Sequence, residues 1–131
     1  MQEARINLSV SQATDFLKQS IQEKGLTLFS DIDHETNAKA YELKMPASRL
    51  LIFGHPKAGT RLMQENIKIS IELPLRLAII DNNGQTLILY PKVSDYGKQY
   101  QLNNQQVLQA METLFATLLK ELTSYSEQSQ H

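Results

Sequence analysis

Apolar and polar residues change their spacing several times along the chain, and each spacing predicts a different kind of element. Alternation over 4–8 and 26–32 predicts two strands, and the nearly continuous apolar run 49–53 predicts a strand in the interior of a sheet. Two further strands, 75–81 and 85–90, flank a polar turn and predict a hairpin. Within 26–32 and just beyond, alternation would put Leu26, Leu28 and Ile32 on one face and Phe29, Asp31 and Asp33 on the other.

Apolar steps of three and four residues predict two long helices. Ser11 as N-cap and Gly25 as helix stop indicate a first helix over about 11–24. A stripe that starts at Leu108 and reaches Tyr125 predicts a last helix over about 105–123. Shorter helical segments are expected at three further places: within 35–43, from Thr60 to 65 or 66, and within 93–100.

The order of the main elements is β-α-β-β-β-β-α, with the long helices at the two ends. This order predicts the α+β class, with an antiparallel sheet covered by the N- and C-terminal helices. The 131 residues contain no repeat and no linker, so we expect a single domain over 1–131. Its core should span about 5–122, followed by a polar, frayed tail over 124–131.

Composition excludes several functional classes. Thirteen Lys and Arg against fourteen Asp and Glu give a net charge of -1, which argues against nucleic acid and anionic membranes as partners. The absence of Cys excludes disulfides and thiolate metal sites. The start has no signal-peptide pattern and no stretch reaches the roughly 20 apolar residues of a membrane span, so we expect a cytoplasmic protein.

The segment Asp31-Ile32-Asp33-His34-Glu35 is the densest cluster of groups that could bind a metal or transfer protons. Asp31 and Asp33 would leave one strand face about 7 Å apart, which suits a hard cation or acid–base chemistry. His34 could bind a transition metal or move protons near neutral pH. Alternatively, Asp33 caps a helix and its neighbours are solvated. The spacing matches no known metal motif, so Asp31, Asp33 and His34 are only weak metal candidates, and no cofactor is indicated.

The segment 54–60 joins a predicted buried strand to a predicted helix. It is not a nucleotide-hydrolysing loop, because the Lys expected before Thr60 is missing and Pro56 lacks a backbone donor. Free amides at the start of a helix over 60–66, with Lys57 nearby, could still hold a small anion. Alternatively, Gly54 and Gly59 adopt backbone dihedrals closed to other residues while Pro56 stiffens the turn.

Arg76 and Tyr90 are polar residues in otherwise apolar strands. A three-residue turn over 82–84 would place them opposite each other, whereas a two-residue Asn83-Gly84 turn would place Leu77 opposite Tyr90. The sequence leaves this register open. Such residues are most often found at a rim or an interface.

Three segments together resemble the bacterial and archaeal domain-of-unknown-function family 302: Phe29-Ser30-Asp31-Ile32-Asp33-His34, Leu51-Ile52-Phe53-Gly54-His55-Pro56-Lys57-Ala58-Gly59-Thr60 and Leu73-Pro74-Leu75-Arg76. The most specific motif is Phe-Gly-x-Pro-Lys-x-Gly-Thr, and the resemblance covers about 5–122. His55 stands where most members are expected to have Asn. The resemblance implies a curved antiparallel sheet like one repeat of the TATA-binding protein, and a homodimer. It implies no activity.

The functional hypothesis is a small homodimeric module that binds a small anionic or metal-associated ligand. Asp33, His34, Lys57 and the amides near Gly59 and Thr60 would form its site, which requires Lys57 and His34 to share one hollow. One alternative is an enzyme with His34 or Asp33 as general base and Lys57 stabilising an anion, and another is a scaffold that docks a partner chain. The full set of candidate ligand-binding residues is Asp33, His34, Gly54, His55, Lys57, Gly59, Thr60, Arg76 and Tyr90.

Overall fold

A computed structural model describes residues 1–129 and contains one five-stranded sheet. The strands run antiparallel in the order β1-β5-β4-β3-β2, so that β1 and β2 form the edges. This arrangement confirms the predicted α+β class and the interior position of the 49–53 segment. The strands are β1 (Gln2–Ile6), β2 (Thr27–Asp33), β3 (Ser48–Gly54), β4 (Leu75–Asn82) and β5 (Gln85–Tyr90).

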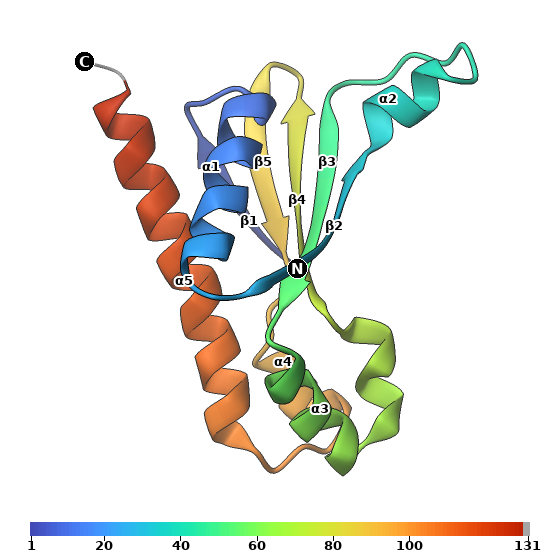
Figure 1. Cartoon of the computed structure of the whole chain (residues 1–131), viewed down its shortest axis with the longest axis vertical. Helices are drawn as coiled ribbons and strands as arrows, with labels where there is room; N and C mark the ends of the chain where they lie inside the picture. Colours follow the sequence, from blue (N-terminus) through green and yellow to red (C-terminus); the bar gives the residue numbers. More distant parts are fainter. Residues whose placement is uncertain (130–131) are drawn as a thin grey trace.

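Two long helices cover one face of the sheet, as predicted (Figure 1). They are α1 (Val10–Glu23) and α5 (Gln105–Gln128). The shorter helices lie toward the two ends of the strands, with α2 at the upper end and α3 at the lower end in Figure 1. These shorter elements are α2 (His34–Lys39), α3 (Pro56–Glu65), the 3-10 helix η1 (Ile67–Glu72) and α4 (Asp95–Gln99).

The core lies between the sheet and the two long helices. Its fully buried members include Leu17 and Ile21 from α1, Leu51 and Phe53 from β3, and Leu118 from α5. Burial of one such side chain contributes roughly 1.5–3 kcal/mol to folding. The hydrophobic spacing of α1 and α5 therefore fixes these helices on the sheet.

The observed ends of the long helices differ from the predicted ones. Ser9, not Ser11, caps α1 and forms a capping box with Gln12, whereas Gly25 ends the helix with φ +73 as predicted. Helix α5 continues five residues past the predicted end at 123, because Tyr125 stacks on Phe16 with ring centroids 4.6 Å apart. The predicted frayed tail is thus wrong over 124–128, and His131 lies outside the described residues.

The β4–β5 hairpin has the two-residue turn. Asn82 pairs with Gln85, and Asn83 and Gly84 both have positive φ (54° and 89°), as a tight hairpin turn requires. Extending this register places Leu77 opposite Tyr90. Arg76 and Tyr90 therefore do not form a cross-strand pair.

Edge strand β2 contains a bulge at Phe29. Leu28 pairs with Phe53, whereas Ser30 pairs with Ile52, so Phe29 is the extra residue. A bulge reverses the facing of every later residue, so Leu28 and Ile32 lie on opposite faces and their predicted shared face is wrong.

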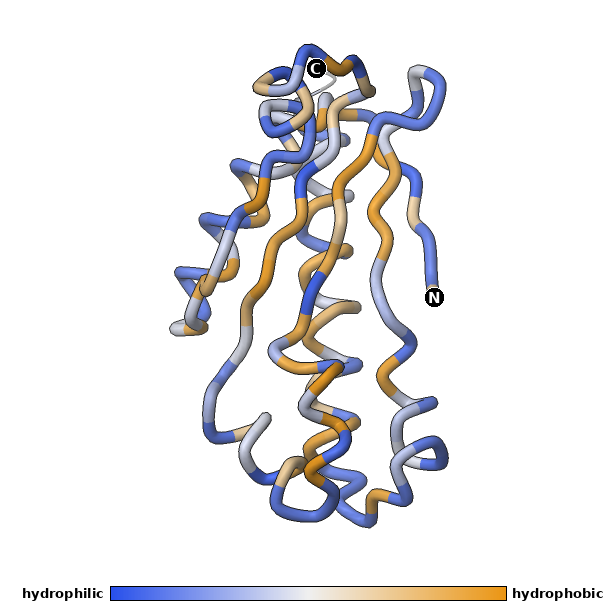
Figure 2. The backbone as a smooth tube through the Cα atoms, turned by 90° about the vertical axis from the view of Figure 1, so that its right-hand side faces the viewer, coloured by the Kyte–Doolittle hydropathy of each residue, from blue (hydrophilic) through white to orange (hydrophobic). Residues whose placement is uncertain are grey.

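The sheet face opposite α1 and α5 points toward the viewer in Figure 2. We call it the open face. Its residues come from β3, β4 and β5, and they include Leu50, Ile52, Ala78, Ile80 and Leu89, all half-buried.

Candidate ligand cavity beside helix α3

The predicted loop 54–60 is mostly helix. Helix α3 begins at Pro56, a residue well suited to a first helical position because its missing N–H needs no partner there. The His55 side chain caps it, since Nδ1 accepts a hydrogen bond from the Lys57 N–H at 3.2 Å. The amides of Ala58 and Gly59 donate to the His55 carbonyl at 3.0 and 3.3 Å. The predicted anion site of free amides near Gly59 and Thr60 is therefore wrong.

The glycines of this segment do not supply unusual backbone angles either. Gly25 and Gly84 are the two glycines with positive φ among the described residues, so the expectation for Gly54 and Gly59 is also wrong. A Cβ atom added to Gly59 would lie 3.7 Å from Leu73 Cδ1 and 4.0 Å from Met63 Cε, which are ordinary contact distances. Gly59 thus leaves space beside these two side chains, although Gly in a helix costs about 1 kcal/mol relative to Ala.

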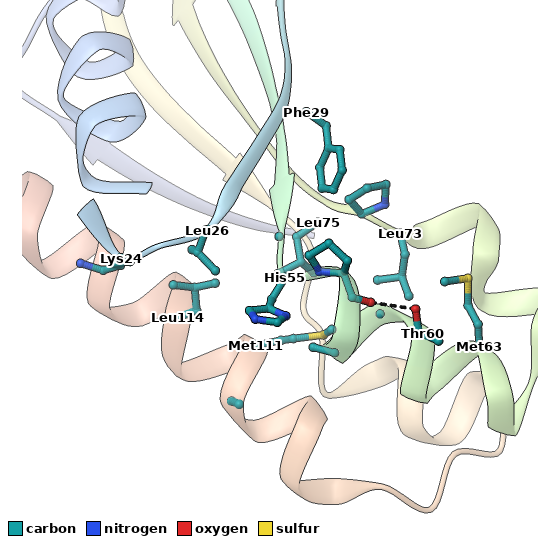
Figure 3. Close-up of a pocket in the computed structure, with 16 residues that line it drawn as sticks. Lys24, Leu26, Phe29, His55, Thr60, Met63, Leu73, Leu75, Met111 and Leu114 are labelled. Atoms are coloured by element: carbon teal, nitrogen blue, oxygen red, sulfur yellow. Dashed lines mark hydrogen bonds between the residues drawn. The ribbon is translucent and has the colours of Figure 1, made fainter. Parts of the chain in front are cut away.

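That space belongs to a cavity of about 480 Å³ between α3, α5 and the lower ends of β2, β3 and β4 (Figure 3). Its volume lies in the usual range of small-molecule sites. Three parts of the chain supply its apolar wall: Leu26 and Phe29 around β2, Met63, Leu73 and Leu75 from α3 to β4, and Met111 and Leu114 on α5.

Phe29 lines this cavity because it occupies the β2 bulge. Bulges re-aim side chains, and this one brings an aromatic ring to the cavity, as the close-up shows. The side chain is 49% exposed, which is high for a Phe. A bound apolar molecule would remove this ring from water.

Three polar side chains reach the cavity, and two of them have their donors engaged. The Lys24 ammonium donates to both carboxylate oxygens of Glu121, at 2.6 and 2.8 Å. The Thr60 hydroxyl donates to the Pro56 carbonyl at 2.8 Å (Figure 3). His55 is the third, and its Nδ1 is an acceptor, so the neutral ring carries its proton on Nε2. Within residues 1–129 this Nε2–H donates to no protein atom.

The acidic cluster lies elsewhere and is already paired. Asp31 accepts hydrogen bonds from Arg49 Nε and from Lys18 Nζ, both at 2.9 Å, and also from Arg49 Nη2. Partial burial raises the pKa of the Asp31 carboxyl, but the hydrogen bonds from Arg49 and Lys18 outweigh it and hold the pKa below its ordinary value. Its carboxylate therefore stabilises the contact between α1, β2 and β3.

Asp33 and His34 lie at the start of α2, where neither needs a ligand to explain its position. Asp33 is the N-cap of α2 and accepts from the Thr36 N–H at 3.0 Å, as the alternative interpretation of this segment predicted. This hydrogen bond lowers the pKa of the Asp33 carboxyl. His34 is exposed at the first position of α2. Within residues 1–129 no three His, Asp or Glu side chains are grouped as a metal site would require.

The structure separates His34 from Lys57. Asp33, just before His34, pairs with Arg49, whereas Thr27 at the other end of β2 pairs with Gly54, three residues before Lys57. Six strand steps correspond to about 20 Å. The hypothesis that the two groups share a hollow within one subunit is therefore wrong.

Arg76 and Tyr90 lie outside the cavity lining. Arg76 is on the open face and donates to the Ile71 carbonyl at 3.2 Å. Tyr90 stacks on Phe115 of α5, with ring centroids 5.4 Å apart. Of the residues predicted to bind a ligand, the cavity brings together Gly54, His55, Gly59 and Thr60.

The sequence analysis missed the apolar residues that make up most of the wall. Met111 lies within the predicted last helix, but nothing in the sequence predicted that it would line a cavity together with the 54–60 segment. Phe29 and Leu73 stand in segments that carry the family resemblance, but nothing in the sequence marks them as cavity residues, and Leu114 stands in no motif. Only the long-range packing of α5 against α3 and the unrecognised bulge in β2 bring them together.

The fold is of the α+β class, and the cavity lies at one end of its sheet. Residues 2–118 match the family model described as "Domain of unknown function DUF302", and the chain belongs to this family. The crystal structure of an uncharacterized conserved DUF302 protein from Bacillus stearothermophilus has a TM-score of 0.80 with this chain. That match covers 92% of this chain and 96% of the other at 17% identity, so it shows a shared fold.

Two curated relatives are named as fluoride channels. The protein "Fluoride-specific ion channel FluC 1" of Brucella suis biovar 1 is 36% identical over 78 residues, which are 59% of this chain and 31% of that protein. The protein of the same name from Brucella abortus biovar 1 is 36% identical over 78 residues, 29% of its length. The match thus spans less than a third of these relatives. Within residues 1–129, no helix combines the length and apolar character that a bilayer crossing needs.

Proposed function

We propose that this chain is a binding module for a small molecule, and that the ligand occupies the cavity beside α3. The observation that carries the proposal is the cavity itself, a concave apolar volume of about 480 Å³ with the His55 imidazole among its lining residues. Small-molecule sites have this character: an apolar wall with few polar groups that fix orientation.

Two local features support a cavity that is kept open for a ligand. The bulge in β2 places the half-exposed Phe29 at the cavity. At position 59 the structure has room for the methyl group of an Ala, but the residue is Gly. Each feature has a cost in the free chain, since an exposed aromatic ring and a helical glycine both reduce stability. Ligand binding would offset the first cost.

A matched pair of substitutions on α5 tests the proposal. Ala110 lines the cavity and is exposed, so Ala110→Trp would fill the mouth without disturbing the core. Ala116 is exposed on the same helix and does not line the cavity, so Ala116→Trp is the control. The probe is anilinonaphthalene sulfonate, whose fluorescence rises in apolar sites. We expect enhancement with the wild type and Ala116→Trp, and little with Ala110→Trp. Equal enhancement in all three proteins would refute the cavity as the ligand site.

Fluoride, the ion named for the channel relatives, serves as a competitor in the same experiment. A small, strongly hydrated anion needs several donors to replace its water, and among the side chains that line the cavity within residues 1–129 only His55 has an uncommitted N–H. We therefore expect sodium fluoride not to displace the probe beyond the effect of sodium chloride at equal ionic strength. Displacement by fluoride alone would favour an ion site instead.

We also propose that two copies associate through the open face. The apolar side chains of β3, β4 and β5 on that face support this, because a second sheet would bury what α1 and α5 leave uncovered. Sedimentation equilibrium should give twice 14.9 kDa for the wild type and 14.9 kDa for Ile80→Glu. Ile67→Glu, at a 71% exposed position on η1, is the control and should remain a dimer. A wild type of monomer mass would refute this association and leave the cavity, which one chain completes, unaffected.

The enzyme alternative has no geometric support within one subunit. It requires His34 or Asp33 to act beside Lys57, and these groups lie at opposite ends of β2 and β3. Asp33 is also committed to capping α2. We therefore do not propose catalysis.

A further inference from the structure

The chemistry of the cavity restricts the kind of ligand it can hold. Its wall is apolar over most of its extent, and the donors of Lys24 and Thr60 are already engaged by Glu121 and Pro56. A ligand with several polar groups would lose hydrogen bonds to water without replacing them. The body of the ligand must therefore be apolar.

The polar end of the ligand is specified by His55. Its Nδ1 is fixed as an acceptor by the Lys57 N–H, which leaves Nε2–H as a donor. Figure 3 shows the His55 imidazole beside Met111 and Leu114, and His55 is exposed, so a polar group bonded to it also stays in contact with water. A ligand acceptor that meets this N–H would keep its apolar body against α5 and Phe29.

The local field favours a negative acceptor. His55 lies at the N-terminus of α3, a ten-residue helix, and the positive end of the helix dipole points toward it. The next charged residues along α3 are Lys57 and Arg61, both positive and exposed. Among residues 1–129, the carboxylate bonded to a cavity-lining side chain is that of Glu121, and Lys24 neutralises it.

On these grounds, and resting on the proposed function, we infer that the ligand is an apolar monocarboxylate, such as a medium-chain fatty acid or an arylalkanoic acid. Its carboxylate accepts from His55 Nε2–H, and its apolar part fills the space between Phe29, Gly59, Met63 and Met111. Gly59 matters here because its missing side chain leaves room beside Met63.

The test compares decanoate with decanol, which has the same chain without the charge. Each is titrated below its aggregation limit into the wild type and into His55→Asp, Ala110→Trp and Ala116→Trp. Asp is a favoured N-cap, so His55→Asp keeps the cap of α3 while it replaces the donor by a negative charge. Loss of a hydrogen bond to a charged group weakens binding by about tenfold or more.

We expect decanoate to bind the wild type at least about tenfold more tightly than decanol does. His55→Asp should lose that advantage and leave decanol binding within about twofold, and Ala110→Trp should abolish both. If His55→Asp does not fold, as judged by circular dichroism, His55→Ala removes the donor without adding a charge, although loss of the cap costs about 1 kcal/mol of stability.

The outcomes separate this inference from the proposed function. If decanoate and decanol bind equally, and His55→Asp changes neither while Ala110→Trp blocks both, the carboxylate assignment is wrong and the cavity is still the site. If neither compound binds the wild type, the monocarboxylate class is refuted, and the fluorescence comparison of Ala110→Trp with Ala116→Trp decides separately whether the cavity binds any ligand.

Discussion

The two ends of the β2–β3 pair differ in how their polar groups are used. At the upper end, Asp31 is bonded to Lys18 and Arg49, and Asp33 caps α2. At the lower end, an apolar cavity retains one uncommitted donor on His55. The upper end carries the residues that attract attention in a sequence, and the structure uses them for stability. The ligand site that we propose lies at the lower end, where most of the wall is apolar.

This contrast shows why charge density is a poor guide to a site. A carboxylate that is partly buried needs partners, and once it has them it offers little to a ligand. A cavity needs missing volume, which in this protein arises from a glycine in a helix and a bulge in an edge strand. The following variants test whether the two ends are as distinct as the geometry indicates.

Asp31→Ala should have the largest effect on stability. It removes the shared partner of Lys18 and Arg49 and leaves Arg49 with only its longer ion pair to Asp33, at 4.0 Å, so we expect a loss of about 2 kcal/mol at pH 7. Urea unfolding measures it. Decanoate affinity should not change, and a binding defect in a folded Asp31→Ala protein would show that the two ends are coupled.

The contribution of Asp31 should also depend on pH. Its pKa in the folded chain lies below the ordinary value of 3.8, so its stabilising effect is complete above that value and is lost as pH falls through the folded pKa. The difference in unfolding free energy between wild type and Asp31→Ala should therefore be constant from pH 7 to about 5 and shrink below about 4. A difference that grows in acid would reverse the assigned sign.

Gly59→Ala should act in the opposite direction at the lower end. Ala favours the helix by about 0.5–1 kcal/mol, and its methyl group would contact Leu73 and Met63 without a clash. Thermal unfolding should therefore occur at a higher temperature than in the wild type, while decanoate binds more weakly because the cavity is smaller. A destabilised Gly59→Ala protein would mean that the glycine is required for packing.

His34→Ala should have the smallest effect. His34 is exposed and makes no contact with the cavity, so stability should change by less than about 0.5 kcal/mol and ligand affinity should not change. Urea titrations of this variant and the wild type measure the stability, and decanoate titrations measure the affinity. Weaker decanoate binding in His34→Ala would instead indicate a site formed by the cavity of one copy and the upper end of a second copy.

Much of the fold could be predicted from the sequence because local rules determine it. The stripe on α5, the continuous apolar run of β3 and the Asn83-Gly84 turn each reflect a period or a backbone preference contained within a few residues. The N-cap of α1 was misplaced by two residues because Ser9 and Ser11 both fit, and only the Gln12 side chain favours Ser9. The start of α3 could have been found, since Pro56 suits a first helical position.

The site was less predictable for a different reason. His55, Gly59 and Thr60 stood out because they form a motif, but their surroundings are set by long-range packing of α5 and by one extra residue in β2. A bulge reverses strand facing and has no dependable signature in a single sequence. The prediction that Lys57 and His34 share one hollow was wrong, because two residues that both stand in motif segments need not be close in space.

The four methionines permit the most direct measurement of the central claim, that a small ligand occupies the cavity beside α3. Met63 and Met111 line the cavity, whereas Met1 and Met45 do not, so a protein labelled at its methionine methyl groups carries two reporters and two internal controls. On titration with decanoate, we expect the NMR signals of Met63 and Met111 to shift together along one binding curve while those of Met1 and Met45 stay in place. Shifts at Met1 and Met45 with none at Met63 and Met111 would contradict it.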